Sequence, residues 1–220
     1  MCVNYRSDAA AAADVVASIE RQGGSAFSIQ ADISSEAEVE RMFKMIDERG
    51  VRLDALVNNA GVLARQMRVD EMSAARMHQI IATNVVGSML CAREAVRRMS
   101  TRHGGSGGAI VNVSSRAAVL GAAGEYVDYA ASKAAIDAMT VGLAREVALE
   151  GVRVNGVRPG LIHTEMHASG GEPARVTRLA PSVPMGRGGA PAEVAHAVLW
   201  LLSDEASYVT GTLIDVSGGR

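Results

Sequence analysis

The sequence of 220 residues is poor in cysteine, in aromatic residues and in lysine. Its two cysteines, Cys2 and Cys91, are too few for the disulfide framework of a small secreted domain. Positive charge dominates no window and the formal net charge is −2. Electrostatic binding to nucleic acid or to an anionic membrane surface is therefore not expected.

Long apolar runs are also absent. The longest stretch without a charged residue, 77–92, contains polar side chains such as Thr83 and Asn84, which makes it too polar for a membrane-spanning helix. Arg6 and Asp8 interrupt any apolar run at the N-terminus, so no signal peptide is expected. With 48% hydrophobic and 21% charged residues, the chain is predicted to be one soluble, cytoplasmic globular domain over its whole length.

Short apolar runs alternate with longer helical patterns along the chain. Ser35 and Glu38 have the spacing of a capping box, and Asp8 can cap the first helix. The predicted strands are 2–5, 26–30, 53–57, 109–113, 152–157 and 213–216. The predicted helices are 8–23, 35–50, 73–99 with a break near Asn84, 129–150 and 192–202. The glycine- and proline-rich segment 169–191 is expected to be an irregular loop. Strands separated by helices predict an α/β fold, with a mainly parallel sheet covered on both faces.

Lysine occurs only at Lys44 and Lys133, against 20 arginines. Lys133 follows Tyr129 by four residues in a helical stretch, so both side chains project from one face. An ammonium beside a phenol favours the phenolate and lowers the pKa of the tyrosine, which could then donate or accept a proton near neutral pH. A solvated lysine beside a half-buried tyrosine is the simpler interpretation of this pair taken alone.

Two serines follow the predicted strand 109–113. Ser114 and Ser115 would lie at the carboxyl edge of the sheet, where open α/β folds bind ligands. A hydroxyl at this edge could donate a hydrogen bond to a substrate carbonyl or alkoxide. Alternatively, both serines only turn the chain.

Asn58-Asn59-Ala60-Gly61 follows another apolar strand, upstream of the serine, tyrosine and lysine. With these ordered motifs, the chain resembles the classical short-chain dehydrogenase/reductase family over essentially its whole length. The resemblance implies a Rossmann-type, doubly wound sheet. It also implies hydride exchange between a nicotinamide cofactor and a carbonyl or secondary alcohol.

The resemblance assigns roles to four residues. Tyr129 would be the general acid/base, and Lys133 would lower its pKa and hold the nicotinamide ribose. Ser115 would position the reacting oxygen, and Asn84 would hold a water in a proton relay. Thirteen residues separate Ser115 from Tyr129, where twelve is usual, so Ser114 stays open as an alternative.

The resemblance also implies cofactor contacts. Asp32 and Ile33 would meet the adenine, although Asp32 could equally be a helix-entry residue. The adenosine side would be lined by Asn58, Ala60 and Gly61. The nicotinamide carboxamide would be held by the segment that includes Pro159, Gly160, Ile162 and Thr164, although Pro159-Gly160 could be an ordinary turn.

The residues after strand 2–5 bear on the choice of cofactor. An acidic residue there would bind the ribose 2′-hydroxyl of NAD and repel a 2′-phosphate. The strand is followed instead by Arg6 and Ser7, with no acidic residue before Asp8. Arginine can bind a phosphate, so NADP(H) is favoured over NAD(H). Alternatively, Arg6 is only a solvated surface charge.

His163 and His167 have metal-ligand spacing for a helix, but they follow a Pro-Gly turn and no third ligand is evident. No metal is therefore expected. The family resemblance implies a homo-oligomer, a dimer or tetramer, formed through the last strand and the helices around Asn84 and Tyr129.

The glycine-rich turn of the family, roughly TGxxxGxG after a first strand, is not in the sequence. The run 104–108 precedes a strand instead of opening a helix after one. In the strand order 3-2-1-4-5-6, that first strand would lie between 2–5 and 53–57, so each of these two would keep an unpaired edge.

We therefore expect the fold to be truncated at the N-terminus, the natural chain having about one further βα unit there. A non-catalytic subunit acting in binding or assembly is the alternative. A sugar-nucleotide epimerase, which also uses a Tyr/Lys pair, is a third possibility. The expected substrate is a small molecule, and these residues do not identify it.

Overall fold

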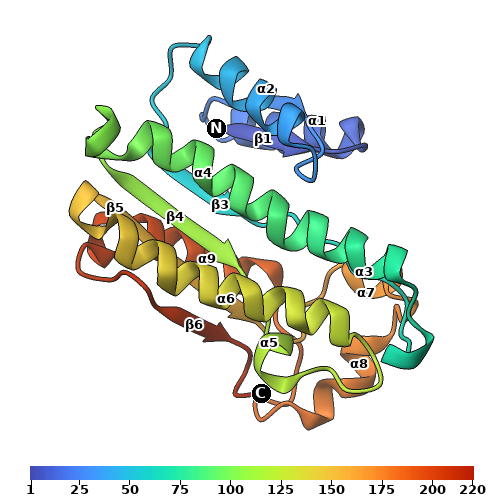
Figure 1. Cartoon of the computed structure of the whole chain (residues 1–220). Helices are drawn as coiled ribbons and strands as arrows, with labels where there is room; N and C mark the ends of the chain where they lie inside the picture. The colour runs from blue at the N-terminus through green and yellow to red at the C-terminus, as the bar shows by residue number, and fades with distance from the viewer. The chain divides into compact units, whose positions relative to one another are not determined.

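The computed structural model describes residues 1–220 and contains two compact units, Met1–Arg52 and Leu53–Arg220. Each unit has its own parallel β-sheet (Figure 1). The expected α/β class with parallel strands is confirmed.

The first unit is a β-α-β-α segment. Strands β1 (Cys2–Tyr5) and β2 (Phe27–Gln30) pair in parallel. Helix α1 (Ala9–Arg21) begins as expected, since the Ala11 amide donates a hydrogen bond to the Asp8 carboxylate at 2.8 Å. Helix α2 (Glu36–Asp47) contributes most of the buried apolar side chains of this unit. They are Val39, Met42, Phe43 and Ile46.

The entry of α2 differs from the expected capping box. Ser35 makes no side-chain hydrogen bond at the helix start. Glu38 instead accepts a hydrogen bond from the Asp32 amide at 2.8 Å, and the Asp32 carboxylate accepts from the Ser34 amide at 2.9 Å and from its hydroxyl at 2.7 Å. The capping-box prediction is wrong, because the Asp32 turn places a nearer amide in front of Glu38. Asp32 therefore has the helix-entry role that the sequence allowed.

The second unit is built on four parallel strands in the order β3-β4-β5-β6. Ile110 lies opposite Leu56 on one side and Val154 on the other, and both Ile110 and Val154 are fully buried. The strands are β3 (Ala55–Asn58), β4 (Gly108–Val113), β5 (Val152–Pro159) and β6 (Leu213–Val216). β1 pairs only with β2, and β3 only with β4, so each has one edge without a paired strand.

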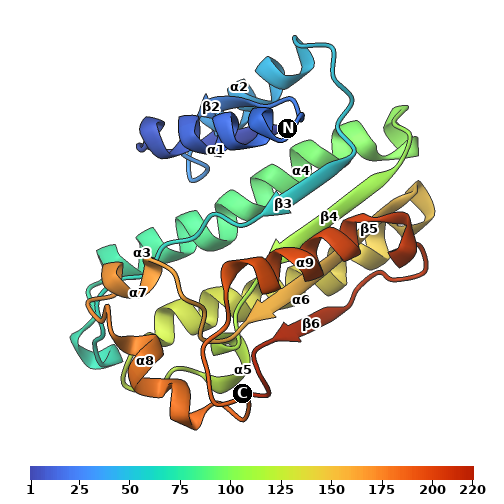
Figure 2. The same ribbon diagram turned by 180° about the vertical axis from the view of Figure 1, so that it is seen from behind.

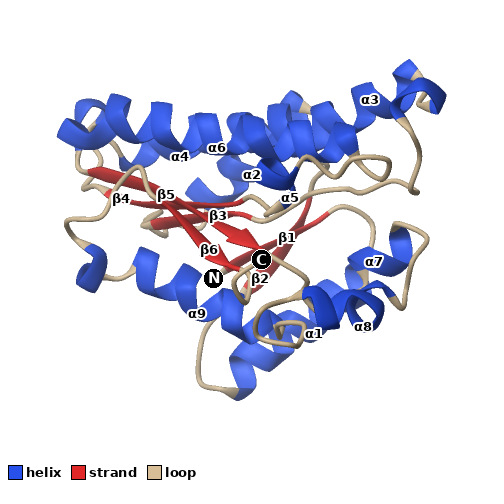
Figure 3. Cartoon of the chain, turned by 90° about the horizontal axis from the view of Figure 1, so that it is seen from below, coloured by secondary structure: helices blue, strands red, loops and turns tan.

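Helices cover both faces of the second sheet. α4 (Ser88–Met99) and α6 (Val127–Val147) pack on one face and α9 (Pro191–Leu202) on the other (Figures 2 and 3). The shorter helices are α3 (Ala74–Ile81), α5 (Ala117–Leu120), α7 (Met166–Ser169) and α8 (Arg175–Leu179). None of the helices is both long enough and apolar enough to cross a bilayer.

Two segments depart from regular α-helix or loop. Ala82–Gly87 forms a π-helical turn between α3 and α4, at the place where a break near Asn84 was expected. The segment 169–191 is not wholly irregular, because it contains α8 and the 3₁₀ turn Ala180–Ser182. These helices are only a few residues long, and the frequent glycines and prolines of the segment gave no helical pattern in the sequence.

Candidate active site

A cavity of 310 Å³ lies in the second unit, beyond the carboxyl ends of β4 and β5. This is the edge at which open α/β sheets bind ligands. Apolar side chains such as Leu63, Leu161 and Val194 form much of its wall. Seven predicted site residues line it: Ser115, Tyr129, Lys133, Pro159, Gly160, Ile162 and Thr164.

Helix α6 presents Tyr129 and Lys133 to this cavity. Nζ of Lys133 lies 5.7 Å from the centre of the Tyr129 ring and donates a hydrogen bond to the Val113 carbonyl at 2.8 Å. Lys133 is only 4% exposed. An ammonium has three donors, so two N–H groups of Lys133 remain for a ligand or for the tyrosine.

Burial dominates the protonation of this pair. Desolvation lowers the pKa of Lys133 to about 8, and the negative charge of Asp137 opposes that shift. Desolvation raises the pKa of Tyr129 to about 12, and a hydrogen bond with Ser115 opposes it. The pKa of Tyr129 thus lies above its ordinary value, opposite to the expected lowering, because loss of solvent penalises the phenolate more than the neighbouring Ser115 stabilises it.

The two serines after β4 have different partners. Ser114 is buried, and its hydroxyl donates a hydrogen bond to the Lys133 carbonyl at 3.0 Å. The Ser115 hydroxyl accepts a hydrogen bond from the Ala117 amide at 3.1 Å. It also lies near enough to Tyr129 to act on the pKa of that phenol, which it lowers. Both serines line the cavity, but the Ser114 hydroxyl is engaged by the helix backbone, whereas Ser115 acts on the pKa of Tyr129.

Asn84 lies in the π-helical turn and is completely buried. Its Nδ2 donates hydrogen bonds to the Val62 carbonyl and to the Ser132 hydroxyl, both at 3.0 Å. Its Oδ1 accepts from the Val62 amide at 2.7 Å. Asn84 does not line the cavity, but a Cβ added to Gly61 would lie 3.4 Å from both Asn84 Oδ1 and Lys133 Nζ. The loop after β3 thus approaches these two groups closely, as glycine permits.

Asn58 belongs to a buried polar ladder. Its Nδ2 donates to Asn112 Oδ1 at 2.9 Å, and Nδ2 of Asn112 donates to the Thr140 hydroxyl at 2.9 Å. The ladder ties β3 to β4 and β4 to α6, a structural role that the sequence motif did not reveal. Asn58, Ala60 and Gly61 are not among the residues that line the cavity.

The remaining predicted residues lie in the first unit. Arg6 and Ser7 follow β1, and Asp32 and Ile33 follow β2. Hydrogen bonding from the Ser34 hydroxyl lowers the pKa of Asp32, and Arg6 adds a smaller electrostatic contribution of the same sign. Arg6 is therefore close enough to Asp32 for their charges to interact.

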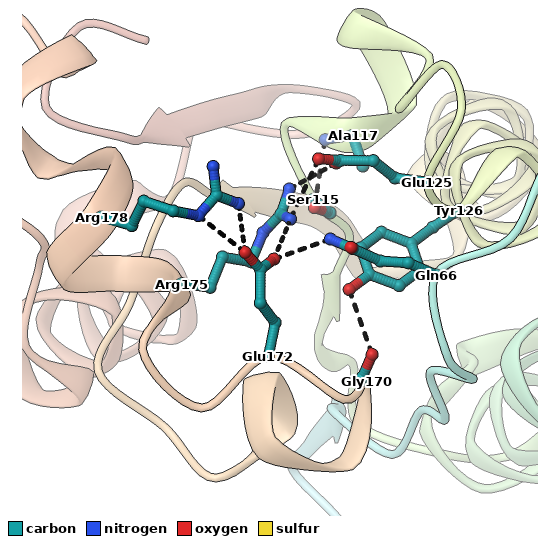
Figure 4. A network of polar contacts seen from close by, with 9 residues as sticks. All are labelled: Gln66, Ser115, Ala117, Glu125, Tyr126, Gly170, Glu172, Arg175 and Arg178. Carbon is teal, nitrogen blue, oxygen red and sulfur yellow. Dashed lines mark hydrogen bonds and ion pairs between the residues drawn. The ribbon is translucent and has the colours of Figure 1, made fainter.

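A charged network on the cavity wall was not predicted (Figure 4). The Arg175 guanidinium in α8 donates to both carboxylate oxygens of Glu125, at 2.5 and 3.1 Å, and to Glu172 at 2.8 Å. It also lies 5.3 Å from the centre of the Tyr126 ring. Gln66 and Arg178 hold Glu172 as well. The network links α8 to the loop before α6. It was not predicted because the sequence around Arg175 shows no periodic pattern.

The two histidines of the same segment have separate contacts. His167 lines the cavity, and its Nε2 lies 3.0 Å from the Ile162 carbonyl. Burial lowers the pKa of His167. The His163 amide donates a backbone hydrogen bond to the Gly189 carbonyl.

Known proteins resemble this chain over nearly its full length. A family model described as enoyl-(acyl carrier protein) reductase matches residues 1–220. The chain is 58% identical over 220 residues to an uncharacterized oxidoreductase, YgfF, of Escherichia coli strain K12, covering 100% of this chain and 89% of that protein. It is 35% identical over 222 residues to a 3-oxoacyl-[acyl-carrier-protein] reductase of Synechocystis, covering 99% and 85% of the two chains.

A solved structure gives the same answer for the fold. A crystal structure of a protein provisionally assigned as a gluconate dehydrogenase, from Agrobacterium tumefaciens, superposes with a TM-score of 0.90 at 30% identity, covering 99% of this chain and 84% of that one. All three are named as oxidoreductases, and the last two are named for different substrates, a 3-oxoacyl-[acyl-carrier-protein] and gluconate. The chain belongs to the short-chain dehydrogenase/reductase family, whose members are NAD(P)-dependent oxidoreductases.

Proposed function

We propose that the protein transfers a hydride between NADP(H) and a carbonyl or secondary alcohol, with Tyr129 as the general acid and base. One observation carries this proposal. Ser115, Tyr129 and Lys133 line a single cavity at the carboxyl edge of the second sheet. That cavity offers a proton donor, a second hydroxyl to position the substrate oxygen, and a buried cation, which together suit carbonyl reduction.

The cavity suits the nicotinamide end of the cofactor. Lys133 keeps two unpaired N–H groups, which match the two hydroxyls of a ribose. Gly61 leaves no side chain in front of Asn84 and Lys133. The carboxamide would be held by the cavity residues Pro159, Gly160, Ile162 and Thr164. When bound, the cofactor supplies the hydride in reduction and accepts it in oxidation.

The protein's own groups handle the proton. In reduction Tyr129 donates its proton to the substrate oxygen, while Ser115 donates a hydrogen bond that positions this oxygen. The raised pKa of Tyr129 keeps the phenol protonated at neutral pH. The Lys133 ammonium stabilises the phenolate that remains. Asn84 completes the proton relay by holding a water, for which the second lone pair of its Oδ1 is the available acceptor.

The adenosine half of the cofactor would be bound by residues that follow strands β1, β2 and β3. Arg6 and Ser7 would contact the 2′-phosphate of NADP, and the absence of an acidic residue between β1 and Asp8 supports this preference over NAD. Asp32 and Ile33 would meet the adenine. The adenosine side would be lined by Asn58, through its backbone, and by Ala60 and Gly61.

We also propose that both units serve one nucleotide-binding domain, 1–220, in a cytoplasmic homo-oligomer, a dimer or tetramer. Both cysteines are free thiols, which suits a reducing compartment. Large apolar side chains are exposed on two surfaces, which suits subunit contacts. They are Val86 and Met89 near α4, and Leu199 and Trp200 on α9.

Substitution of Tyr129 in the natural protein tests the proposal. Tyr129→Phe should lower kcat for NADPH oxidation with a ketone by about 10³-fold or more, because it removes the proton donor. Its Kd for NADPH should stay unchanged, since the phenyl ring keeps the packing. Turnover and cofactor binding are measured separately, by NADPH absorbance and by NADPH fluorescence.

The two serines provide a matched control. Ser115→Ala should lower kcat by about 10²-fold, because it removes a hydrogen bond to the reacting oxygen. Ser114→Ala should keep most of the turnover, because its hydroxyl donates its hydrogen bond to the Lys133 backbone.

Retained turnover in Tyr129→Phe would contradict the assignment of Tyr129 as the general acid and base. NADPH binding without oxidation across a broad ketone panel would favour the non-catalytic subunit.

A further inference from the structure

A partly buried carboxylate lies one helical turn beyond Lys133. Asp137 follows Lys133 by four residues on α6, so the two side chains share a face of the helix. Oδ2 of Asp137 lies 2.8 Å from Nε of Arg158, whereas Oδ1 is buried without a hydrogen-bond partner. The Asp137 side chain is 14% exposed. An ionised carboxylate has about four acceptor sites, so one arginine leaves part of its hydrogen-bonding capacity unused.

Asp137 ends a row of alternating charges. Arg158 also lies 3.6 Å from Asp215 Oδ1, and Nη1 of Arg116 lies 2.6 Å from Asp215 Oδ2. The row therefore runs from Arg116 through Asp215 and Arg158 to Asp137, across β6 and β5 to α6. Arg116 is the neighbour of Ser115 in sequence, so both ends of the row adjoin residues that line the cavity.

Lys133 has no other counter-charge around it. The groups that face it from the packed elements are the Val113 carbonyl on β4, the Asn84 amide in the π-helical turn and the Tyr129 phenol on α6. All three are uncharged at neutral pH. A lysine buried in such surroundings tends to lose its proton.

We infer that Asp137, whose charge Arg158 partly offsets, is a positioning residue that keeps Lys133 protonated in its buried site. The inference rests on the proposed function, which requires a charged lysine. The Asp137 charge raises the pKa of Lys133 against the larger effect of desolvation. Because Arg158 binds the carboxylate, Asp137 acts from one turn away and leaves two N–H groups of Lys133 free for the ribose.

The scarcity of lysine makes this inference directly measurable. Only Lys44 and Lys133 would give side-chain signals in a protein labelled with ¹³C,¹⁵N-lysine. Lys44 is exposed, so Lys44→Arg removes its signal without disturbing the core. NMR titration of the remaining signal then reports the protonation of Lys133 alone, in the full chain and independently of turnover.

Two variants should move this titration in opposite directions. Asp137→Asn should shift the Lys133 midpoint to lower pH, because it removes the counter-charge. Arg158→Gln should shift it to higher pH, because it removes a cation and leaves the Asp137 carboxylate uncompensated. Glu146→Gln, which neutralises an exposed carboxylate on the same helix, should leave the midpoint in place. A general loosening of the fold would move both variants of the pair in the same direction.

The pH profile of turnover gives the functional readout. In Asp137→Asn the loss of kcat at alkaline pH should begin at lower pH than in the wild type, and Asp137→Glu should restore the wild-type profile. An unchanged Lys133 midpoint in Asp137→Asn overturns the inference, as does a lowered midpoint in Arg158→Gln. If Asp137→Asn does not fold, Arg158→Gln alone decides. Full turnover in Lys133→Met would instead overturn the proposed function and leave the Lys133 titration as a separate result.

Discussion

The two units differ in how deeply they bury their elements. Strand β1 of the first unit has no buried residue, whereas four of the six residues of β4 are buried. Helix α1 buries only Ala12, whereas α6 buries polar groups as well, Lys133 and Thr140 among them. The proposed proton-transfer residues thus lie in the well-packed unit, and the residues proposed to distinguish the cofactors lie in the lightly packed one.

This difference follows from what each task requires. Proton transfer needs side chains held to within a fraction of an ångström, which dense packing and hydrogen bonding provide. Recognition of a phosphate by an exposed arginine depends chiefly on attraction between opposite charges, which acts over a longer range. Substitutions in the two units should therefore have distinct signatures.

The largest effect is expected from Phe43, the largest fully buried side chain of the first unit. Phe43→Ala should cost about 3–5 kcal/mol of folding free energy. With so few other buried side chains, residues 1–52 should lose most of their protection from hydrogen exchange, while β4 and α6 keep theirs. Hydrogen-exchange mass spectrometry measures both units at once.

The exposed neighbour Lys44 provides the control for this change. Lys44→Ala should leave the protection of residues 1–52 unchanged, since this side chain is 77% exposed. Equal loss of protection in both units of Phe43→Ala would mean that they unfold as one, and the contrast between them would not hold.

A gain of stability is expected from Lys133→Met in the second unit. The pKa of Lys133 is lowered from 10.5 to about 8, so burial of its charge costs the folded state about 3 kcal/mol at most. That cost is fully present below pH 8 and disappears as the pH rises towards 10.5. Wild-type stability should therefore rise over this range, and the variant should gain most at pH 7.

Urea denaturation at several pH values, with turnover assayed in parallel, tests this prediction. Lys133→Met should be inactive at every pH. A gain of the same size at pH 7 and at pH 10.5 would show that improved packing, and not the removal of a buried charge, stabilises the variant.

The smallest effect is expected from Arg6 in the first unit. Arg6→Ala should weaken NADPH binding about tenfold, or about 1.4 kcal/mol, and leave NADH binding unchanged, because only NADPH has the 2′-phosphate. Arg21→Ala, which removes another cation of the same unit, is the matched control. Equal weakening of both cofactors would assign Arg6 a structural role.

Much of the fold could be predicted because buried parallel strands are continuous apolar runs. The strands at 2–5 and 213–216 begin and end as expected, and those at 109–113 and 152–157 differ only at their ends. The start of α2 could not be predicted in detail. The Glu38 carboxylate could accept a hydrogen bond from the Ser35 amide or from the Asp32 amide. Which of the two it binds depends on the turn at Asp32.

The positions of three proposed site residues could be predicted, because the spacing of Tyr129 and Lys133 and the end of an apolar strand determine them. Tyr129 and Lys133 share a face of α6, and Ser115 follows β4. The contacts between Arg175 and Glu125, and between Arg158 and Asp137, join separate elements, so no local pattern contains them. The direction of the Tyr129 pKa shift was also missed, because it depends on burial, which spacing does not encode.

The π-helical turn at Ala82–Gly87 determines how α3 is rotated about the helix axis relative to α4, because the three segments are continuous. A π-turn contains one residue more than the α-helical turn it replaces. Deleting a single residue there, for example Val86, would rotate everything before it by about 100° relative to α4. Asn84 would then lose Val62 and Ser132, although its own identity had not changed. The position of the Asn84 amide thus depends on the number of residues in the turn. Deleting one residue there would disturb the site more than most substitutions in this helix.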